Sequence, residues 1–198
     1  MKKLSFAVLT ASALAALAAP AAAQIGFGDA GLEFVDAVKK RDGDKATDML
    51  TQRPASTLVN ARDGDGNTAL LIAVARKDPE WTGFLLNKGA DPNLGGGKGG
   101  DTPLIVAARY GFEEAVGWLL GLGAKVDGTN RMGETALITA VQQRQTPIVR
   151  LLLNAGADPD KADHAAGYSA RDYAQRDNRA RDILQLIQAK RPKAAPAH

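Results

Sequence analysis

Cysteine is absent from this chain of 198 residues, and histidine occurs only at His164 and His198. Without thiols the chain forms no disulfide, no thiolate metal site and no cysteine nucleophile. Two histidines argue against a multi-histidine metal site, and we expect no cofactor. Aromatic residues make up only 5% of the sequence, whereas 45% is hydrophobic and 24% is charged. This composition is typical of globular proteins and favours helices packed through small residues over a β-sandwich.

Long apolar runs are also missing, except at the N-terminus. A basic start at residues 2–3 precedes an apolar run over 4–19, which Pro20 and a short alanine stretch follow. This pattern is typical of a secretory signal peptide with a bacterial character. The run is shorter than the roughly 20 residues of a membrane-spanning helix. We expect a signal peptide over 1–23, cleavage before Gln24, a periplasmic or secreted protein, and no stable membrane insertion.

The net charge gives little support to a polyanion partner. The formal charge is +3, and removal of Lys2 and Lys3 with the signal peptide would lower it by two. A nearly neutral mature chain lacks the strong basic field that nucleic acids require. We therefore expect no nucleic-acid binding.

Two sequence marks recur in register. A hydroxyl residue precedes an apolar run four times, at intervals of 34, 33 and 34 residues: Thr68, Thr102, Thr135 and Ser169. A Leu-Leu-x-x-Gly-Ala segment follows three of these runs, with the glycines at Gly89, Gly123 and Gly156. Two marks that keep the same period indicate repeated supersecondary units that stack on one another.

The marks resemble the ankyrin-repeat family, whose repeat has a Gly-x-Thr-Pro-Leu-His-x-Ala core and a Leu-Leu-x-x-Gly-Ala-Asp end. The resemblance covers about residues 32–190. It implies an all-α solenoid of stacked helix-turn-helix units with short β-turn fingers. The expected units are an N-terminal capping helical pair at 24–60, repeats at 61–93, 94–127 and 128–160, a C-terminal capping repeat at 161–190 and a disordered tail at 191–198.

The residues give physical reasons for this architecture. Each recurring hydroxyl can cap the first helix of its repeat, and Pro103 suits a first helical position. Each recurring glycine can end the second helix in the left-handed conformation.

The sequence departs from the family at two positions of the repeat. The histidine of the core is replaced by other residues: Leu71, Ile105, Ile138 and Arg171. Any hydrogen bonding that this histidine supplies between repeats should be lost. The glycine between the two helices survives only at Gly111, so the turns with other residues in its place should be strained or differently shaped: Lys77, Arg144 and Asn178.

Several motifs of other protein classes match only by letter. The segments 26–31 and 95–100 fit G-x-G-x-x-G, but neither lies between an expected strand and an expected helix. The segment 63–67 begins like a calcium loop, yet Thr68 and Val74 occupy the positions that need Gly and Glu. We interpret these segments as flexible backbone and a tight turn.

The resemblance implies that a partner would bind the concave face, which the finger tips and the inner helices form. Its finger residues are Arg62, Asp65, Asn67, Lys98, Asp101, Arg131, Met132, Glu134 and Tyr168. Its inner-helix residues are Arg76, Arg109, Tyr110, Gln142, Gln143 and Arg176. Tyr, Arg and Met are enriched in interface cores, and Tyr110 beside Arg109 is the expected anchor. The basic residues among them favour a partner with an acidic patch.

We expect a non-catalytic, monomeric scaffold that binds another protein in the periplasm. A variant of this hypothesis is a protective or inhibitory cofactor, either chaperone-like or an immunity protein, for a specific enzyme or toxin. An enzyme with an acidic or His164-centred site is an alternative, as is a protein that binds the cell envelope through its basic row. Catalysis would need convergent acid, base or nucleophile groups in one pocket.

Overall fold

The computed structural model describes residues 26–189, so the expected signal peptide and C-terminal tail lie outside the described residues. Within this range the chain forms eleven α-helices and no β-strand, which confirms the all-α class. The helices are α1 (Gly26–Lys40), α2 (Gly43–Gln52), α3 (Ala55–Leu58), α4 (Ala69–Ala75), α5 (Pro79–Asn87), α6 (Pro103–Tyr110), α7 (Glu113–Gly121), α8 (Ala136–Gln142), α9 (Thr146–Asn154), α10 (Ala170–Arg176) and α11 (Arg181–Ala189).

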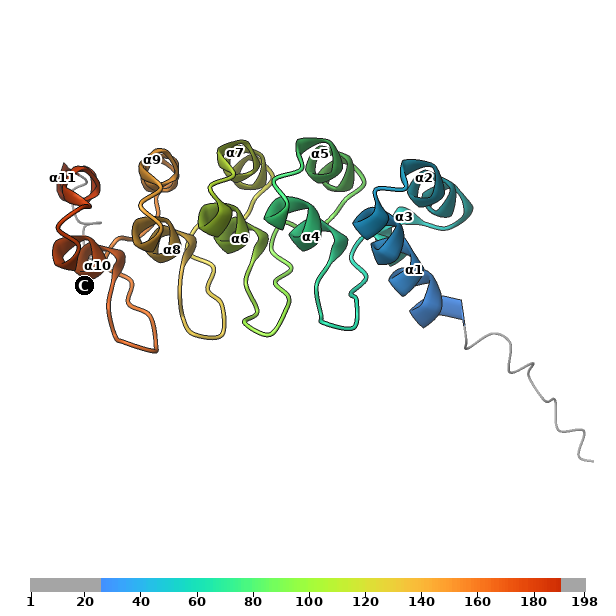
Figure 1. Cartoon of the computed structure of the whole chain (residues 1–198), viewed down its shortest axis with the longest axis horizontal. Helices are drawn as coiled ribbons and strands as arrows, with labels where there is room; N and C mark the ends of the chain where they lie inside the picture. The colour runs from blue at the N-terminus through green and yellow to red at the C-terminus, as the bar shows by residue number, and fades with distance from the viewer. Residues whose placement is uncertain (1–25, 190–198) are drawn as a thin grey trace, which may run out of the picture.

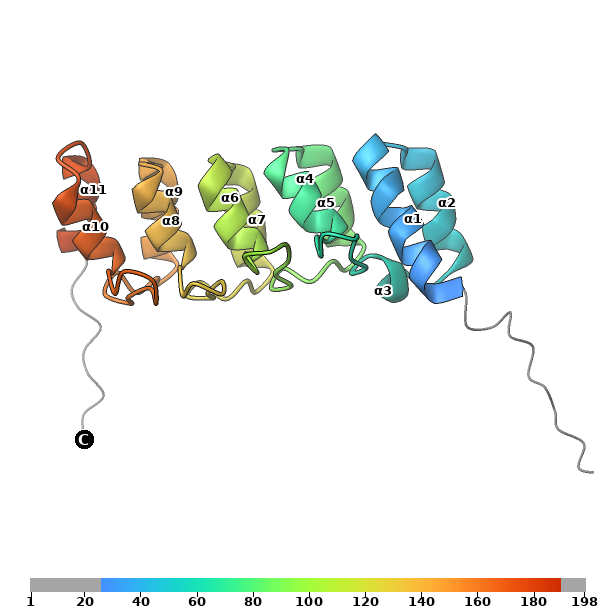
Figure 2. The same cartoon turned by 60° about the horizontal axis from the view of Figure 1, so that its bottom comes forward.

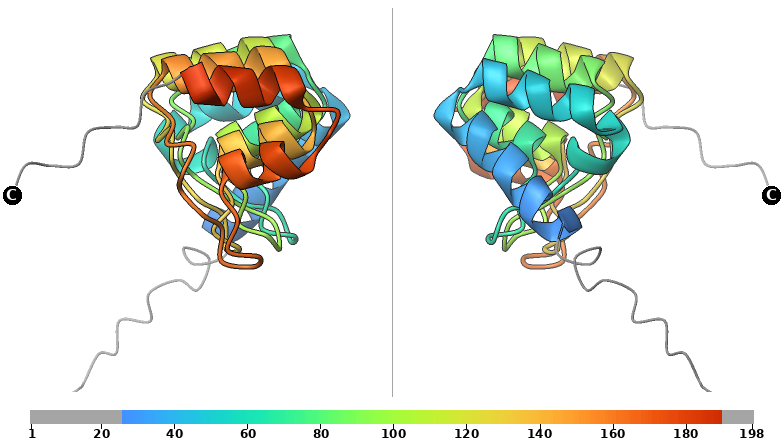
Figure 3. Two further views of the ribbon diagram at one scale, coloured as in Figure 1. Left: turned by 90° about the vertical axis from the view of Figure 1, so that its left-hand side faces the viewer. Right: turned by 90° about the vertical axis from the view of Figure 1, so that its right-hand side faces the viewer.

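The helices form two rows (Figure 1). The inner row runs α1, α4, α6, α8, α10, and the outer row runs α2, α5, α7, α9, α11. Each hairpin packs against the next, as expected of a solenoid. The loops that join successive hairpins project to one side of the rows, as Figures 2 and 3 also show.

These loops are the fingers, which we number 1 to 4: residues 59–68, 93–102, 126–135 and 159–169. Each finger is closed near its base by an isolated antiparallel bridge: Arg62 with Thr68, Gly96 with Asp101, Thr129 with Thr135, and Ala162 with Ser169. The fingers therefore lie side by side in register and extend the surface of the inner helices.

Hydroxyl side chains begin the inner helices as the sequence predicts. The Oγ1 atoms of Thr68 and Thr135 each accept a hydrogen bond of 3.2 Å from the amide three residues later. Thr102 makes the same contact at 3.3 Å. Ser169 forms a reciprocal capping box with Asp172. Each cap satisfies an otherwise free amide at a helix start.

The turns between paired helices adopt left-handed backbone. Gly111 has φ of 68°, whereas Lys77 and Arg144 have φ of 53° despite their side chains. This conformation costs a non-glycine residue roughly 1–2 kcal/mol. The expectation of strained turns is confirmed at these two residues. Asn178 is not among the described residues with positive φ, so the last turn has a different shape.

Apolar side chains fill the space between the two rows. Leu70 and Leu104 of the inner row are buried, as are Leu85 and Leu119 of the outer row. At the N-terminal end, α1 completely buries three side chains of its apolar face, Phe34, Val35 and Val38. The short helix α3 follows the expected N-terminal helical pair and leads into finger 1, an element that the sequence pattern did not predict.

A ladder of side-chain oxygens joins successive repeats. Asn60 Oδ1 accepts the amide of Asp91 at 2.9 Å, and Asn93 Oδ1 accepts that of Lys125 at 2.7 Å. The next rung runs from the Asp158 amide to Asp127 at 2.9 Å. Hydrogen bonds between repeats therefore come from these three residues at the bases of the fingers, and not from the positions where the family has histidine.

Candidate functional site

The inner helices and the fingers form one continuous surface, which we call the inner face. It contains a hollow of about 200 Å³ between fingers 1 and 2. Leu71, Ala75 and Val106 supply apolar lining. The remaining lining comes from five residues of the expected binding face and from three glycines: Asn67, Lys98, Asp101, Arg109, Tyr110, Gly96, Gly97 and Gly99. The structure therefore brings together residues that lie far apart in the sequence.

Glycines of finger 2 line this hollow and lie close to finger 1. A Cβ atom at Gly96 would lie 2.4 Å from the carbonyl oxygen of Gly66 and 2.6 Å from Leu71 Cδ1. Finger 2 approaches finger 1 this closely only without a side chain. The Gly97 amide also donates to the Gly66 carbonyl at 3.2 Å. The close approach of the two fingers therefore depends on the absence of a side chain at Gly96.

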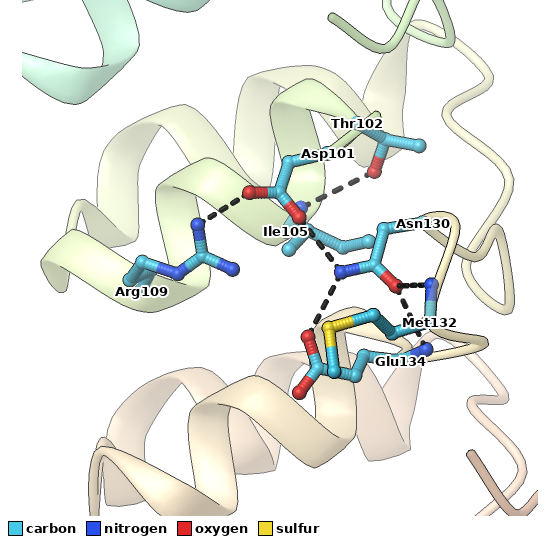
Figure 4. Close-up of polar contacts among 7 residues, drawn as sticks. All are labelled: Asp101, Thr102, Ile105, Arg109, Asn130, Met132 and Glu134. Atoms are coloured by element: carbon cyan, nitrogen blue, oxygen red, sulfur yellow. Dashed lines mark hydrogen bonds and ion pairs between the residues drawn. The ribbon is translucent and has the colours of Figure 1, made fainter. Parts of the chain in front are cut away.

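A polar network borders the hollow (Figure 4). Arg109 forms an ion pair with Asp101, and this hydrogen bond raises the pKa of the guanidinium. Asn130 Nδ2 donates to Asp101 and to Glu134, each at 2.8 Å. Asn130 Oδ1 in turn accepts the amides of Met132 and Glu134. The network joins Arg109 to finger 3 through Asp101 and Asn130, so Arg109 is held in place before any partner binds.

Three other arginines of the expected site support the fold itself. Arg62 Nη1 donates to the Gly66 carbonyl at 2.7 Å within finger 1. Arg76 donates to two carbonyls at the end of α1. Arg131 Nη1 donates to the Lys98 carbonyl at 2.8 Å and so joins fingers 2 and 3. These guanidinium groups are positioned by backbone oxygens of their own chain.

Two large apolar side chains of the expected site face solvent. Tyr110 and Met132 are each 50% exposed, at the end of α6 and on finger 3. Asp65 and Gln143 are exposed as well, at the tip of finger 1 and after α8. Exposed large apolar groups beside fixed polar groups are typical of an interface core.

The C-terminal part of the inner face has a second hollow, of about 470 Å³. It lies between α8, α10 and the turns that follow them, and its lining residues are Val141, Gln142, Arg144, Tyr173, Arg176, Asp177 and Arg179. The Arg176 guanidinium carbon lies 3.9 Å from the centre of the Tyr168 ring. Three residues of the expected site, Gln142, Tyr168 and Arg176, are therefore brought together here.

A buried carboxylate supports this end of the face. Asp163 accepts the Tyr173 hydroxyl at 2.7 Å and the amides of Ala166 and Gly167 in finger 4. Burial raises the pKa of Asp163, but these hydrogen bonds outweigh burial, and the net shift is downward. The same bond raises the pKa of Tyr173. Tyr173 thus presents its ring, and not its hydroxyl, as the available part of the side chain.

Sequence reasoning missed Arg144, Tyr173 and Arg179 as residues of this face. For Arg144 the sequence held a usable signal, because Arg144 aligns with Lys77 and Gly111 in the turn that ends an inner helix. Arg144 donates to Asp177 of the following turn at 2.9 Å. Arg179 lies in the last turn, whose shape no repeat predicts.

Three other kinds of feature would give residues 26–189 a different function: a metal site, a site at His164 and a membrane-spanning helix. No group of three or more His, Asp or Glu side chains in this range is arranged to hold a metal ion. His164 is exposed in finger 4, and its backbone amide donates to the Met132 carbonyl at 2.8 Å. No helix among these residues combines the length and apolar character that crossing a bilayer requires.

Comparison with known proteins agrees with the repeat geometry. The family profile "Ankyrin repeats (3 copies)" matches residues 34–130 and 95–163. The chain is 34% identical over 122 residues to the ANK repeat-containing protein nipk-1 of Caenorhabditis elegans, which covers 54% of this chain and 20% of that protein. It is 36% identical over 112 residues to the nuclear factor NF-kappa-B p105 subunit of Mus musculus, over 56% of this chain and 12% of that protein.

A third relative is the human mitochondrial disaggregase, 43% identical over 63 residues, or 32% of this chain and 9% of that protein. The chain thus spans a fifth or less of each of these three relatives, and the similarity is confined to repeats. The profile match and the stacked hairpins agree over most of the described residues. This chain belongs to the ankyrin-repeat family.

Proposed function

We propose that the chain is a non-catalytic, monomeric scaffold that binds a partner protein through its inner face. The observation that carries this proposal is the hollow between fingers 1 and 2, beside the half-exposed side chains of Tyr110 and Met132. At about 200 Å³ the hollow is smaller than the roughly 300–1,000 Å³ of small-molecule sites. It suits one inserted side chain of a partner.

The polar groups beside the hollow support binding over catalysis. Asp101, Arg109 and Asn130 satisfy one another through direct hydrogen bonds. A general acid or base needs a free position within hydrogen-bond reach of a substrate. The network instead fixes the shape of the face, as a preorganised interface requires.

We place the scaffold in the periplasm or outside the cell. The support is the pattern of the N-terminal segment, with lysines, a short apolar run and alanines before Gln24. N-terminal sequencing of the protein recovered from a periplasmic extract would test this placement. A chain that begins at Gln24 is expected, and an intact N-terminus on a cytosolic protein would contradict it.

Capture of the partner tests the binding face. The tagged protein is expressed in its own cells, cross-linked in place and purified, and attached proteins are identified. The double variant Tyr110→Ala/Met132→Ala should reduce capture about tenfold, because it removes the central apolar contacts. Leu122→Ala is the matched control, since Leu122 is 56% exposed but lies just after α7 in the outer row.

Equal capture by the double variant and the parent would place binding elsewhere, and no captured protein under several growth conditions would contradict the scaffold. The activity and lifetime of a captured enzyme or toxin, with and without the scaffold, would distinguish tethering from protection or inhibition. Thermal unfolding of each variant verifies that the fold is intact.

A further inference from the structure

Arg176 is held over an aromatic ring with its hydrogen-bonding edge open. Its guanidinium carbon is 3.9 Å from the centre of the Tyr168 ring, which is a cation–π stack. The Tyr168 ring in turn meets Tyr173 edge-on, with ring centres 5.7 Å apart. Stacking fixes the plane of a guanidinium and leaves its N–H donors along the edge available. Among the described residues, no side-chain or backbone oxygen accepts a hydrogen bond from Arg176.

The other arginines of the expected site are less available. Arg62, Arg76 and Arg131 donate to backbone carbonyls, and Arg109 pairs with Asp101. Arg176 is thus the one arginine of the expected site, within residues 26–189, without an oxygen acceptor. The acidic residue one turn before it, Asp172, is bound by the amide and hydroxyl of Ser169.

A second arginine lines the same hollow. Arg179 is exposed, and its guanidinium forms no hydrogen bond or ion pair among the described residues. Arg144 on the opposite rim is paired with Asp177 at 2.9 Å. The hollow of about 470 Å³ therefore carries two arginines that form no ion pair, the Asp177 carboxylate that Arg144 pairs, a tyrosine ring and the Gln142 amide. Asp172 lies near Arg176 and Asp177 near Arg179, but their oxygens accept hydrogen bonds from other groups. Its charge and size suit an acidic segment of a polypeptide.

We infer that Arg176 and Arg179 bind carboxylates of an acidic segment on the partner protein, with Tyr168 as the residue that positions Arg176. This inference rests on the proposed scaffold function and names the partner's chemistry. A carboxylate can accept two parallel N–H bonds from a planar guanidinium, so the stack preorganises a bidentate contact. A nucleic-acid base would need a free aromatic face on which to stack, but Arg176 already covers a face of the Tyr168 ring.

The test is a side-chain NMR titration of the processed protein. The probe is the blocked tetrapeptide acetyl-Asp-Glu-Asp-Glu-amide, and the readout is the Nε–Hε signals of Arg176 and Arg179. Both signals should shift, and Arg176→Gln should weaken binding about tenfold. Arg176→Lys should weaken it by a similar factor, because lysine keeps the charge but loses the planar fork. Tyr168→Phe should bind like the parent, and Arg150→Gln on α9 is the matched control for loss of one exposed arginine.

Several results would overturn the inference. The first is that the neutral peptide acetyl-Asn-Gln-Asn-Gln-amide binds with the same affinity as the acidic peptide. The second is that Arg176→Lys binds the acidic peptide as tightly as the parent does. The third is that inorganic phosphate or an oligothymidylate shifts the arginine signals as much as the acidic peptide does. The absence of any shift in the Arg176 and Arg179 signals would also overturn the inference. The scaffold function fails separately, in the cell capture experiment: if Arg176→Gln captures the partner normally while Tyr110→Ala/Met132→Ala does not, only the acidic-segment inference is wrong.

Discussion

Arg76, the residue that follows α4, donates hydrogen bonds to the carbonyls of Lys39 and Val38 at the end of α1, at 2.9 and 3.0 Å. The last carbonyls of a helix have no partner within the helix, and a positive side chain also complements the helix dipole there. An inner-helix residue expected to contact a partner thus attaches the N-terminal helix to the first repeat.

Replacement of Arg76 should affect stability more than binding. We expect Arg76→Ala to lower the free energy of unfolding by about 1–3 kcal/mol, because two carbonyls lose charged donors. Urea unfolding followed by circular dichroism measures this change. Partner capture should be unchanged at a temperature where the variant is folded. If Arg76→Ala lost partner capture but kept its stability, Arg76 would be a binding residue and this prediction would be wrong.

The left-handed turn at Lys77 predicts a stabilising substitution. Lys77→Gly should raise the free energy of unfolding by about 0.5–1 kcal/mol, since relief of the left-handed strain exceeds the added flexibility of the unfolded chain. Gly111 occupies the equivalent turn with φ of 68°. The reciprocal change Gly111→Ala should destabilise by a similar amount. Chemical denaturation of both variants checks the pair, and the same sign of effect in both would contradict the strain argument.

Glycines of finger 2 and of the outer helices should respond oppositely to a methyl group. Gly96→Ala should lower the free energy of unfolding and reduce partner capture, because its Cβ would overlap the Gly66 carbonyl and fill the space at the hollow. Gly117 lies within α7 with nothing within 4 Å of an added Cβ. Gly117→Ala should stabilise by up to about 1 kcal/mol, through helix propensity. Thermal unfolding measures both variants. If their melting temperatures shifted in the same direction, the predicted difference between Gly96 and Gly117 would be wrong.

Asp163 should contribute a pH-dependent part of stability. Its pKa in the folded protein lies below its ordinary value of about 3.9, so the unfolded chain binds a proton more readily. The stabilisation is complete above that value and is lost as the pH falls through the folded pKa. Between about pH 5 and pH 3 the Tm of the parent should fall more steeply than that of Asp163→Asn.

Thermal unfolding at a series of pH values measures these slopes. Asp44→Asn, at an exposed position of α2, controls for the loss of one carboxylate. A slope for Asp163→Asn as steep as that of the parent would show that finger 4 does not depend on this charge. Asp63 and Asp172 also have lowered pKa values, so part of the slope should remain in the variant.

The sequence predicted the fold because each repeat signals its own helix boundaries. Thr135, for example, both starts the apolar run in the sequence and caps α8 in the structure. The left-handed turns could be predicted as well, because Lys77 and Arg144 align with Gly111. Such features depend on neighbours within a few residues, and a repeat places them in register.

The chemistry of the inner face was less predictable. Register placed Arg76, Arg131 and Arg176 on one surface, but only the structure shows that two of them donate to carbonyls more than thirty residues away. The reach and direction of a long side chain across repeats leave no mark in local sequence. The hollow between fingers 1 and 2 was missed for a related reason, because it depends on the distance between two backbones.

The ladder through Asn60, Asn93 and Asp127 has a geometric consequence for any partner that spans several repeats. Each rung joins a repeat only to its immediate neighbour. If one rung lengthens, all units beyond it would tilt as a block, and the displacement would grow with distance from the altered rung. A substitution at Asp127 would thereby change the orientation of Arg176 relative to Tyr110 without contacting either side chain, so hydrogen bonds at the bases of the fingers influence the shape of the face that a partner meets.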